Sequence, residues 1–136
     1  RVARGSRILA IDLEQTFVDR VRSRWPSVDC VCASAVELER LVEERKLAPV
    51  DHIISGLPFA SLPVEVTRRI LDGIEHTLRP GGTFTTFQYL RGYGLRPGRV
   101  FRREMNVRMR GLPAQHLVLK NFPIAFILTW TRPAHR

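Results

Sequence analysis

A chain of 136 residues, 44% of them hydrophobic, can bury the core of one ordinary domain without disulfides or a structural metal. It contains no run of about 18 apolar residues, the length of a membrane span, and no signal-peptide pattern, so we expect a cytoplasmic protein. The formal net charge of +9 is unevenly placed: residues 1–90 hold twelve Lys or Arg and twelve Asp or Glu, whereas residues 91–110 hold seven Arg against Glu104.

The first half of the chain alternates short apolar runs with amphipathic segments. Residues 8–12 read as a strand buried on both faces, and apolar residues at four-residue spacing predict a helix over 14–25. The same patterns predict a strand at 28–32, a helix at 35–46 and a strand at 50–55. Such alternation is typical of a parallel sheet with helices packed on both faces.

The second half begins with a helix and ends with strands. A proline at its start and an apolar face predict a helix from Pro63 to Leu78, followed by a Pro-Gly-Gly turn. Residues 83–89 read as the next strand. Residues 116–120 and 125–131 predict a terminal strand pair joined through Asn121-Phe122-Pro123, with the last strand antiparallel to its neighbours.

The cysteines and histidines offer no metal or redox site. Cys30 and Cys32 lie two apart on one strand, without the usual metal-ligand spacing, and we expect buried free thiols. The four histidines are scattered, and no nucleophile elbow or phosphate loop occurs. We therefore predict that no metal binds. Met105, Met109 and Trp130 are interpreted as packing residues.

Several short sequence motifs follow one another in a characteristic order. They are Ile8-Leu9-Ala10-Ile11-Asp12, Phe17 with Arg24-Trp25-Pro26, Ala33-Ser34-Ala35, Ser55-Gly56-Leu57-Pro58-Phe59 with Ser61-Leu62-Pro63, Leu78-Arg79-Pro80-Gly81-Gly82 with Phe87-Gln88-Tyr89, and Asn121-Phe122-Pro123 with Ala125. Together they resemble the bacterial phospholipid N-methyltransferases, which methylate phosphatidylethanolamine and are related to the rRNA adenine dimethyltransferases. The resemblance implies a class I methyltransferase fold: an α/β, Rossmann-like sheet, mostly parallel, with an antiparallel last strand.

The resemblance also implies a site for S-adenosyl-L-methionine at the ends of the strands. Asp12 stands where the family keeps an acidic residue, and a carboxylate there accepts hydrogen bonds from both ribose hydroxyls. Ser34 stands where the family often has an Asp that faces the adenine amino group, although a helix N-cap is an equally good interpretation of this serine. The remaining candidate cofactor-binding residues are Leu13, Ala35 and Ser55.

In methyl transfer the protein mainly has to align the nucleophile and exclude water from the site, because the sulfonium of the cofactor is already activated. The turn that the resemblance places beside the methyl group consists of Ser55, Gly56, Leu57, Pro58 and Phe59. The rings of Phe59, Tyr89 and Tyr93 are candidates to face the growing ammonium. Core packing is an equal alternative for Phe59 and the better one for Phe87.

One part of the resemblance has no counterpart in the sequence. In the superfamily, a first strand and the Gly-rich loop after it hold the methionine part of the cofactor, and that strand lies between the strands that correspond to 8–12 and 50–55. Gly5 alone cannot serve as a multi-glycine loop. We therefore expect residues 1–136 to form a single, N-terminally incomplete methyltransferase domain, either truncated or degenerate.

The arginine-rich segment 91–110 suits phosphate, because a guanidinium binds phosphate oxygens through two parallel hydrogen bonds. Lipid headgroups and nucleic acid both qualify. We expect a flexible segment in which Arg99, Arg102 and Arg103 bind headgroups. A solvated loop is the alternative, since only two of the 22 cations are Lys.

Three functions remain open. The first is an N-methyltransferase that acts on a phospholipid headgroup amine as a peripheral protein at the inner face of the cell membrane. The second is a methyltransferase for RNA adenine or another amine, which Ser55 disfavours because adenine enzymes usually carry Asn or Asp there. The third is a non-catalytic basic module that binds membrane or nucleic acid.

Overall fold

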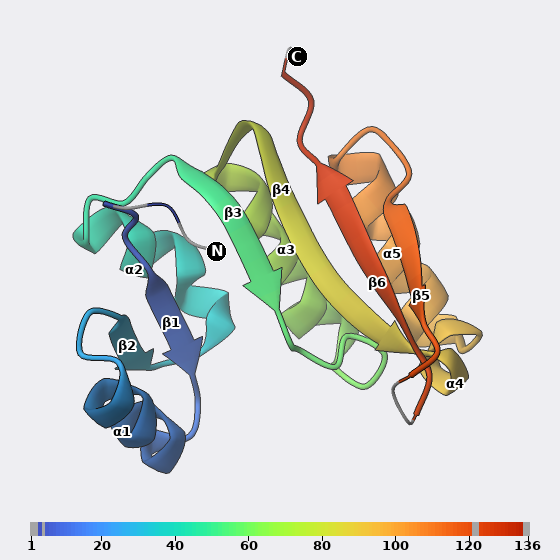
Figure 1. The fold of residues 1–136 in the computed structure, drawn as a ribbon. Coiled ribbons are helices and arrows are strands. Elements are labelled where there is room, and N and C mark those ends of the chain that lie inside the picture. The colour runs from blue at the N-terminus through green and yellow to red at the C-terminus, as the bar shows by residue number, and fades with distance from the viewer. Residues whose placement is uncertain (1–2, 4, 121–122, 135–136) are drawn as a thin grey trace.

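A computed structural model describes residue 3, residues 5–120 and residues 123–134. It confirms the alternation of strands and helices (Figure 1). In chain order the elements are β1 (Leu9–Asp12), α1 (Gln15–Arg24), β2 (Asp29–Cys32), a 3-10 turn η1 (Ala35–Glu37), α2 (Leu38–Glu44), β3 (Val50–Ser55), α3 (Val64–Thr77), β4 (Leu78–Tyr89), α4 (Leu90–Tyr93), α5 (Arg96–Arg108), β5 (Ala114–Val118) and β6 (Ala125–Thr131).

The strands form two hydrogen-bonded groups. β1 pairs with β2 in parallel, and a four-stranded sheet has the order β3-β4-β6-β5. In the larger sheet β3 and β4 are parallel, whereas β6 is antiparallel to both β4 and β5. The predicted antiparallel last strand is therefore confirmed. The predicted connection through Asn121 and Phe122 lies outside the described residues.

β1 and β3 run side by side in the same direction without being paired (Figure 1). Among the described residues no strand lies between them, and the edge that each turns toward the other makes no ladder hydrogen bonds. This is the place where the resemblance puts one further strand. A parallel pair as short as β1–β2 is not stable by itself, so it depends on packing against the rest of the domain.

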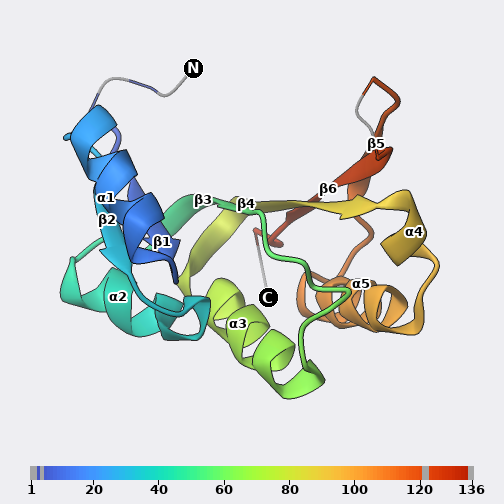
Figure 2. The ribbon, with the colours of Figure 1, turned by 90° about the horizontal axis from the view of Figure 1, so that it is seen from below.

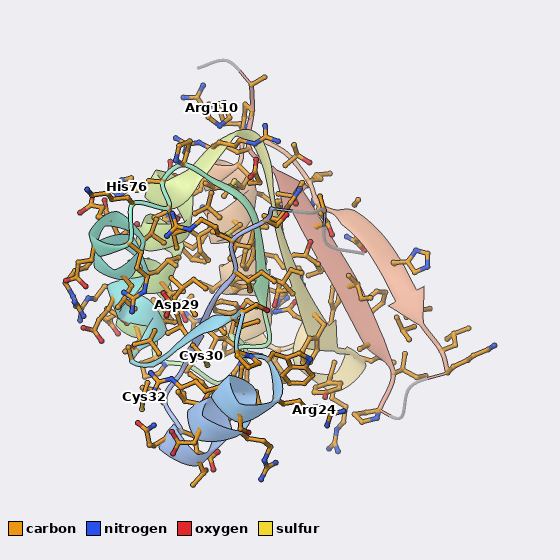
Figure 3. All side chains as sticks on the ribbon, turned by 60° about the vertical axis from the view of Figure 1, so that its left-hand side comes forward. Arg24, Asp29, Cys30, Cys32, His76 and Arg110 are labelled. Carbon is orange, nitrogen blue, oxygen red and sulfur yellow. The ribbon has the colours of Figure 1, made fainter. Side chains whose placement is uncertain are left out.

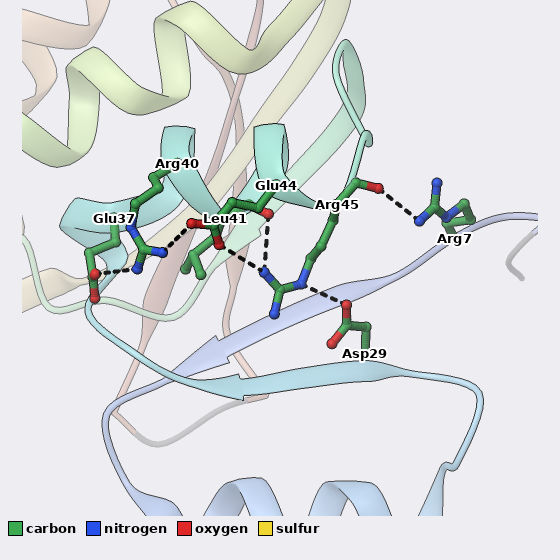
Figure 4. A network of polar contacts seen from close by, with 7 residues as sticks. All are labelled: Arg7, Asp29, Glu37, Arg40, Leu41, Glu44 and Arg45. Carbon is green, nitrogen blue, oxygen red and sulfur yellow. Dashed lines mark hydrogen bonds and ion pairs between the residues drawn. The ribbon is translucent and has the colours of Figure 1, made fainter.

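The smaller sheet is attached through helices and a surface polar network (Figure 4). Arg45 at the end of α2 donates through Nε to Asp29 Oδ2 on β2 at 2.7 Å. Arg7, just before β1, donates to the backbone carbonyls of Arg45 at 3.0 Å and Lys46 at 3.3 Å. Because α2 in turn packs against α3, this network connects β1 and β2 to the helices beneath the larger sheet.

Helices cover one face of the larger sheet (Figure 2). Phe84 on β4 and Trp130 on β6 point toward α3 and α5, and both are at most 1% exposed. Met105 and Met109 are also buried there, so the interpretation of these two and of Trp130 as packing residues is confirmed. Among the described residues no helix covers the opposite face of this larger sheet, whereas α1 packs on the smaller sheet of β1 and β2.

Some local expectations were wrong. The helix that begins after Pro63 ends at Thr77, and Leu78 already belongs to β4, whose pairing with β3 is irregular at this end. The arginine-rich segment was expected to be irregular, but most of it forms α5, because Pro97 opens a helix that buries Phe101 and Met105 one turn apart.

The two cysteines are free thiols, but they differ in exposure (Figure 3). Cys30 is buried beneath Val18 and Val21 of α1, and this burial raises the pKa of its thiol. Cys32 is exposed, contrary to expectation, because it lies at the end of β2 beyond the helix, where its Sγ donates to the Leu13 carbonyl at 3.4 Å.

Candidate active site

Asp12 ends β1 with an oriented carboxylate. Its Oδ1 accepts a hydrogen bond from the Glu14 N–H at 2.8 Å, a local turn that fixes the side chain. Among the described residues its other oxygen has no partner, and Asp12 forms no ion pair. A carboxylate held by one oxygen with the second one free can accept hydrogen bonds from neighbouring hydroxyls of a ligand.

Ser34 and Ala35 reach the same edge of the small sheet, because Asp12 pairs with Cys32 in register. Ser34 forms a capping box: its Oγ accepts from the Val36 N–H at 3.3 Å, and its own N–H donates to Glu37 at 3.2 Å. The N-cap interpretation is thus confirmed. The serine hydroxyl still has its proton to donate to a ligand.

The same hydrogen bonds affect Glu37. A hydrogen bond from Arg40, and then the one from the Ser34 N–H, hold the pKa of Glu37 below its ordinary value. Because the pKa is lowered on folding, the capping box contributes its stability above the ordinary pKa of Glu37 and loses it as the pH falls through the lowered one.

The turn after β3 is fixed by its own polar groups. Ser55 Oγ accepts from the Leu57 N–H at 3.2 Å, and the Ser55 carbonyl accepts from Thr86 Oγ1 at 3.0 Å. Gly56 is exposed, and a methyl group added to it would meet only Phe87 Cε1, at 3.9 Å. Contacts within the protein therefore do not require a glycine here, and the space beside it is open to a ligand. Pro58 is also exposed.

The aromatic candidates separate into two groups. Phe59 is 2% exposed and stacks on Phe101 with ring centroids 4.3 Å apart, so the structure favours core packing over a catalytic role for Phe59. Phe87, expected in the core, is instead exposed on the uncovered face of the sheet, edge to face with Tyr89 at 5.3 Å. These two rings line a shallow hollow of about 250 Å³ together with Val118, Ala125 and Ile127.

The three candidate arginines of α5 have different surroundings. Arg99 and Arg103 are exposed, whereas Arg102 is half-buried with its guanidinium carbon 3.6 Å from the centroid of the Tyr93 ring. The Tyr93 ring also packs against Phe126 at 4.4 Å. Tyr93 is therefore already occupied by a cation of the protein and is not open to the ammonium of an acceptor.

The remaining candidate site residues lie at one side of the molecule, at the carboxyl ends of the strands. Asp12 and Leu13 follow β1, the Ser55–Pro58 turn follows β3, and Tyr89 ends β4, and these three strands point the same way (Figure 1). Leu13 is 74% exposed and makes no core contact that would explain an apolar residue there. The arrangement is that of an open α/β sheet with a ligand site at the carboxyl ends of its strands.

No three His, Cys, Asp or Glu side chains in the described part of the chain come together as a metal-binding group. No helix there is long and apolar enough to cross a membrane.

Comparison with known proteins by sequence gives one curated relative. No protein-family model matches the chain. The ornithine lipid N-methyltransferase of Singulisphaera acidiphila is 28% identical over 87 residues, which cover 62% of this chain and 45% of that protein. The chain thus spans about half the length of the curated relative that it matches.

Comparison by structure identifies the fold. An rRNA methylase from Streptococcus thermophilus superposes with a TM-score of 0.67 at 14% identity, over 93% of this chain and 74% of that one. The N-methyltransferase NodS from Bradyrhizobium japonicum gives a TM-score of 0.65 at 14% identity, over 93% and 74%. The 1,6-didemethyltoxoflavin-N1-methyltransferase of Burkholderia thailandensis, solved with S-adenosylhomocysteine, gives 0.68 at 18%, over 96% and 63%. The chain has the Rossmann-like fold of class I methyltransferases.

Proposed function

We propose that the chain is part of an S-adenosylmethionine-dependent N-methyltransferase that acts on the headgroup amine of a membrane lipid. The observation that carries this proposal is the Asp12 carboxylate, oriented by Glu14 and with one oxygen free, at the end of β1 in a class I methyltransferase fold. The similarity to an ornithine lipid N-methyltransferase supports a lipid amine as the acceptor.

The residues at the strand ends fit the cofactor. Asp12 would accept hydrogen bonds from the ribose hydroxyls, and the Ser34 hydroxyl would donate to the adenine ring, with Leu13 and Ala35 against its apolar surface. Bound S-adenosylmethionine would supply an activated methyl group, so this chain needs to align the acceptor and exclude water rather than to activate the methyl group.

The acceptor side is formed by the turn after β3 and the end of β4. A primary amine with a pKa of about 10.4 must lose a proton before it attacks, which costs roughly 4 to 5 kcal/mol near pH 7. A site poor in water lowers that cost, and carbonyls of the Ser55–Pro58 turn can accept the remaining N–H groups. Tyr89, exposed beside Phe87, offers a ring face to the methylated ammonium, a contact of roughly 0.5 to 2 kcal/mol.

We further propose that a strand with a Gly-rich loop, which none of the described residues forms, completes the cofactor site between β1 and β3. The 136-residue chain is then expected to bind S-adenosylhomocysteine weakly, because its described residues provide no cradle for the methionine part. The measurement is calorimetry on this chain and on the same chain extended at its N-terminus by the first strand and Gly-rich loop of a class I methyltransferase. Tighter binding by the extended chain is expected; equal binding would show that the loop is dispensable here.

Transfer of an isotope-labelled methyl group tests the acceptor. The extended chain is incubated with labelled S-adenosylmethionine and, in parallel, with vesicles of phosphatidylethanolamine, vesicles of an ornithine lipid and structured RNA. Label in either lipid supports the proposal. Label in the RNA alone would show that the acceptor is an RNA base and not a lipid amine. Cofactor binding without transfer to any of the three would favour a non-catalytic module.

The exposed arginines of α5 are expected to attract anionic lipid surfaces. Replacing Arg99 and Arg103 together by Ala should weaken binding to phosphatidylglycerol vesicles by about 1 kcal/mol per cation, because each exposed side chain adds one positive charge that can approach the anionic lipid surface. The loss should shrink as salt is raised. The matched control is the double change of Arg20 and Arg69, which are exposed on other helices. Vesicle binding is measured by co-sedimentation. Equal losses of binding in the two double variants would show that the net charge of the protein, and not the position of the α5 arginines, causes the effect.

A further inference from the structure

Arg102 is a half-buried arginine of α5 without an acidic partner among the described residues, whereas Arg99 and Arg103 are exposed. Arg108 pairs with Asp72 at 2.6 Å, and its neighbour Glu104 also meets Arg68 at 3.3 Å. Among the described residues no carboxylate lies within ion-pair distance of Arg102. Burial, and then repulsion by Arg99, lower the pKa of this guanidinium, which Tyr93 only partly offsets. A half-buried cation without a counter-ion is a place where a bound anion would be stabilising.

Gln88 holds this guanidinium in position. Its Oε1 accepts from Arg102 Nη1 at 2.7 Å, and this is the sole hydrogen bond of the Gln88 side chain among the described residues. Gln88 is 5% exposed, and its Nε2 has no partner, which costs roughly 1 to 3 kcal/mol. An apolar side chain would avoid that cost, so what this glutamine contributes is the orientation of Arg102.

The surroundings fix the orientation of the planar guanidinium and leave its other donors unused. The Tyr93 ring supports one face of the guanidinium. One N–H is taken by Gln88, and in the described part of the chain the remaining N–H groups have no acceptor. A planar fork with free parallel N–H groups is the geometry that binds a carboxylate or phosphate through two hydrogen bonds.

The position of this cluster relates it to the acceptor site. Gln88 precedes Tyr89 at the carboxyl end of β4. Phe101, the neighbour of Arg102 on α5, stacks on Phe59 at the end of the turn that follows β3. The cluster therefore lies on the helix side of the sheet, at the carboxyl end of β4, on a helix that packs against the end of the turn after β3.

We propose that Arg102, positioned by Gln88 and Tyr93, binds the oxyanion of a zwitterionic headgroup whose amine is the methyl acceptor. This inference rests on the proposed function and narrows its substrate class to molecules that carry an amine and a phosphate or carboxylate a few bonds apart. An uncharged base or an isolated amine would leave the guanidinium without its anion.

The test is an NMR titration of the isotope-labelled chain with small probes. Phosphoethanolamine and γ-aminobutyrate carry the amine at the same number of bonds from the phosphorus and from the carboxylate carbon, and ethanolamine carries no oxyanion. We expect saturable shifts near Arg102 with the first two probes and none with ethanolamine. The oxyanion probe that binds with the higher affinity then indicates whether the headgroup carries a phosphate or a carboxylate. Shifts of equal size with all three would overturn the proposal.

Variants separate binding from packing. Arg102→Ala should weaken binding of the better probe at least tenfold, the usual loss for a charge-assisted hydrogen bond, whereas Arg69→Ala should leave it unchanged. Gln88→Glu should also abolish binding, since its carboxylate would occupy the guanidinium fork, while the ion pair keeps the fold intact. Gln88→Leu should weaken binding less than Arg102→Ala, because the cation remains but loses its orientation.

The outcomes also separate this inference from the proposed function. If Arg102→Ala and Gln88→Glu bind the probe as well as the unchanged chain, while S-adenosylhomocysteine still binds, the oxyanion site is wrong and the methyltransferase proposal stands. If the chain, with or without the added strand and loop, binds no S-adenosylhomocysteine, the proposed function fails whatever the probes show.

Discussion

Replacing Phe59 by Ala is expected to lower the free energy of unfolding by about 3 to 5 kcal/mol, measured by urea denaturation. The ring is 2% exposed, stacks on Phe101 at 4.3 Å and meets Phe84 edge to face at 6.3 Å. Its loss leaves a cavity where the turn after β3 packs on α5. Against a usual domain stability of roughly 5 to 15 kcal/mol, this change alone can unfold much of the protein.

Two further variants decide whether Phe59 has any role beyond packing. Tyr89→Ala, a change of an exposed aromatic side chain, should cost far less stability than Phe59→Ala. Phe59→Leu keeps most of the buried volume and should retain methyl transfer if the ring only packs. Loss of methyl transfer by Phe59→Leu in a folded protein would show that the ring has a role in the reaction beyond packing.

Replacing Asp12 by Asn is expected to weaken binding of S-adenosylhomocysteine by roughly 10- to 100-fold, because hydrogen bonds to a charged acceptor contribute about 1.5 to 3 kcal/mol. Asn keeps an oxygen that can accept from the Glu14 N–H, so the local turn should survive. Binding is measured by calorimetry on the chain completed with the first strand and Gly-rich loop.

The control for this change is Asp19→Asn on α1, which removes the same charge from an exposed residue that contacts Gln15 at 2.7 Å. It should bind S-adenosylhomocysteine as the unchanged chain does. If Asp12→Asn binds equally well too, the carboxylate at the end of β1 does not contact the ribose, and the assignment of this edge as the cofactor site loses its main support.

The strands and their order could be predicted because local chemistry decides them. Val50 to Ser55 is a β-branched run closed by a Gly-Leu-Pro turn, and its predicted bounds are those of β3. Asp12 could be placed at a strand end for the same reason. The boundary at Leu78 was predicted wrongly, since apolar spacing continues from α3 into β4 and does not show where the helix stops.

Features that depend on packing could not be read from the sequence. Residues 84 to 89 alternate between the two faces of β4, but the pattern does not tell which face the helices cover, so Phe87 was wrongly placed in the core. The four-residue spacing of Phe101, Met105 and Met109 indicates a helix at α5. The segment was nevertheless predicted to be irregular because it contains so many arginines. The contact of Gln88 with Arg102 had no such signal in the sequence, because it depends on how α5 packs against β4.

The most direct test of a cofactor site at the carboxyl ends of the strands is an NMR titration of the isotope-labelled 136-residue chain with S-adenosylhomocysteine. A cofactor site at this edge of the sheet predicts saturable shifts at the carboxyl ends of β1 and β3. They are expected at Asp12, Leu13, Ser34 and the Ser55–Gly56 amides, with none at the opposite ends of the same strands. Shifts that are absent at high ligand concentration, or that gather elsewhere on the chain, would contradict a cofactor site at this edge of the sheet.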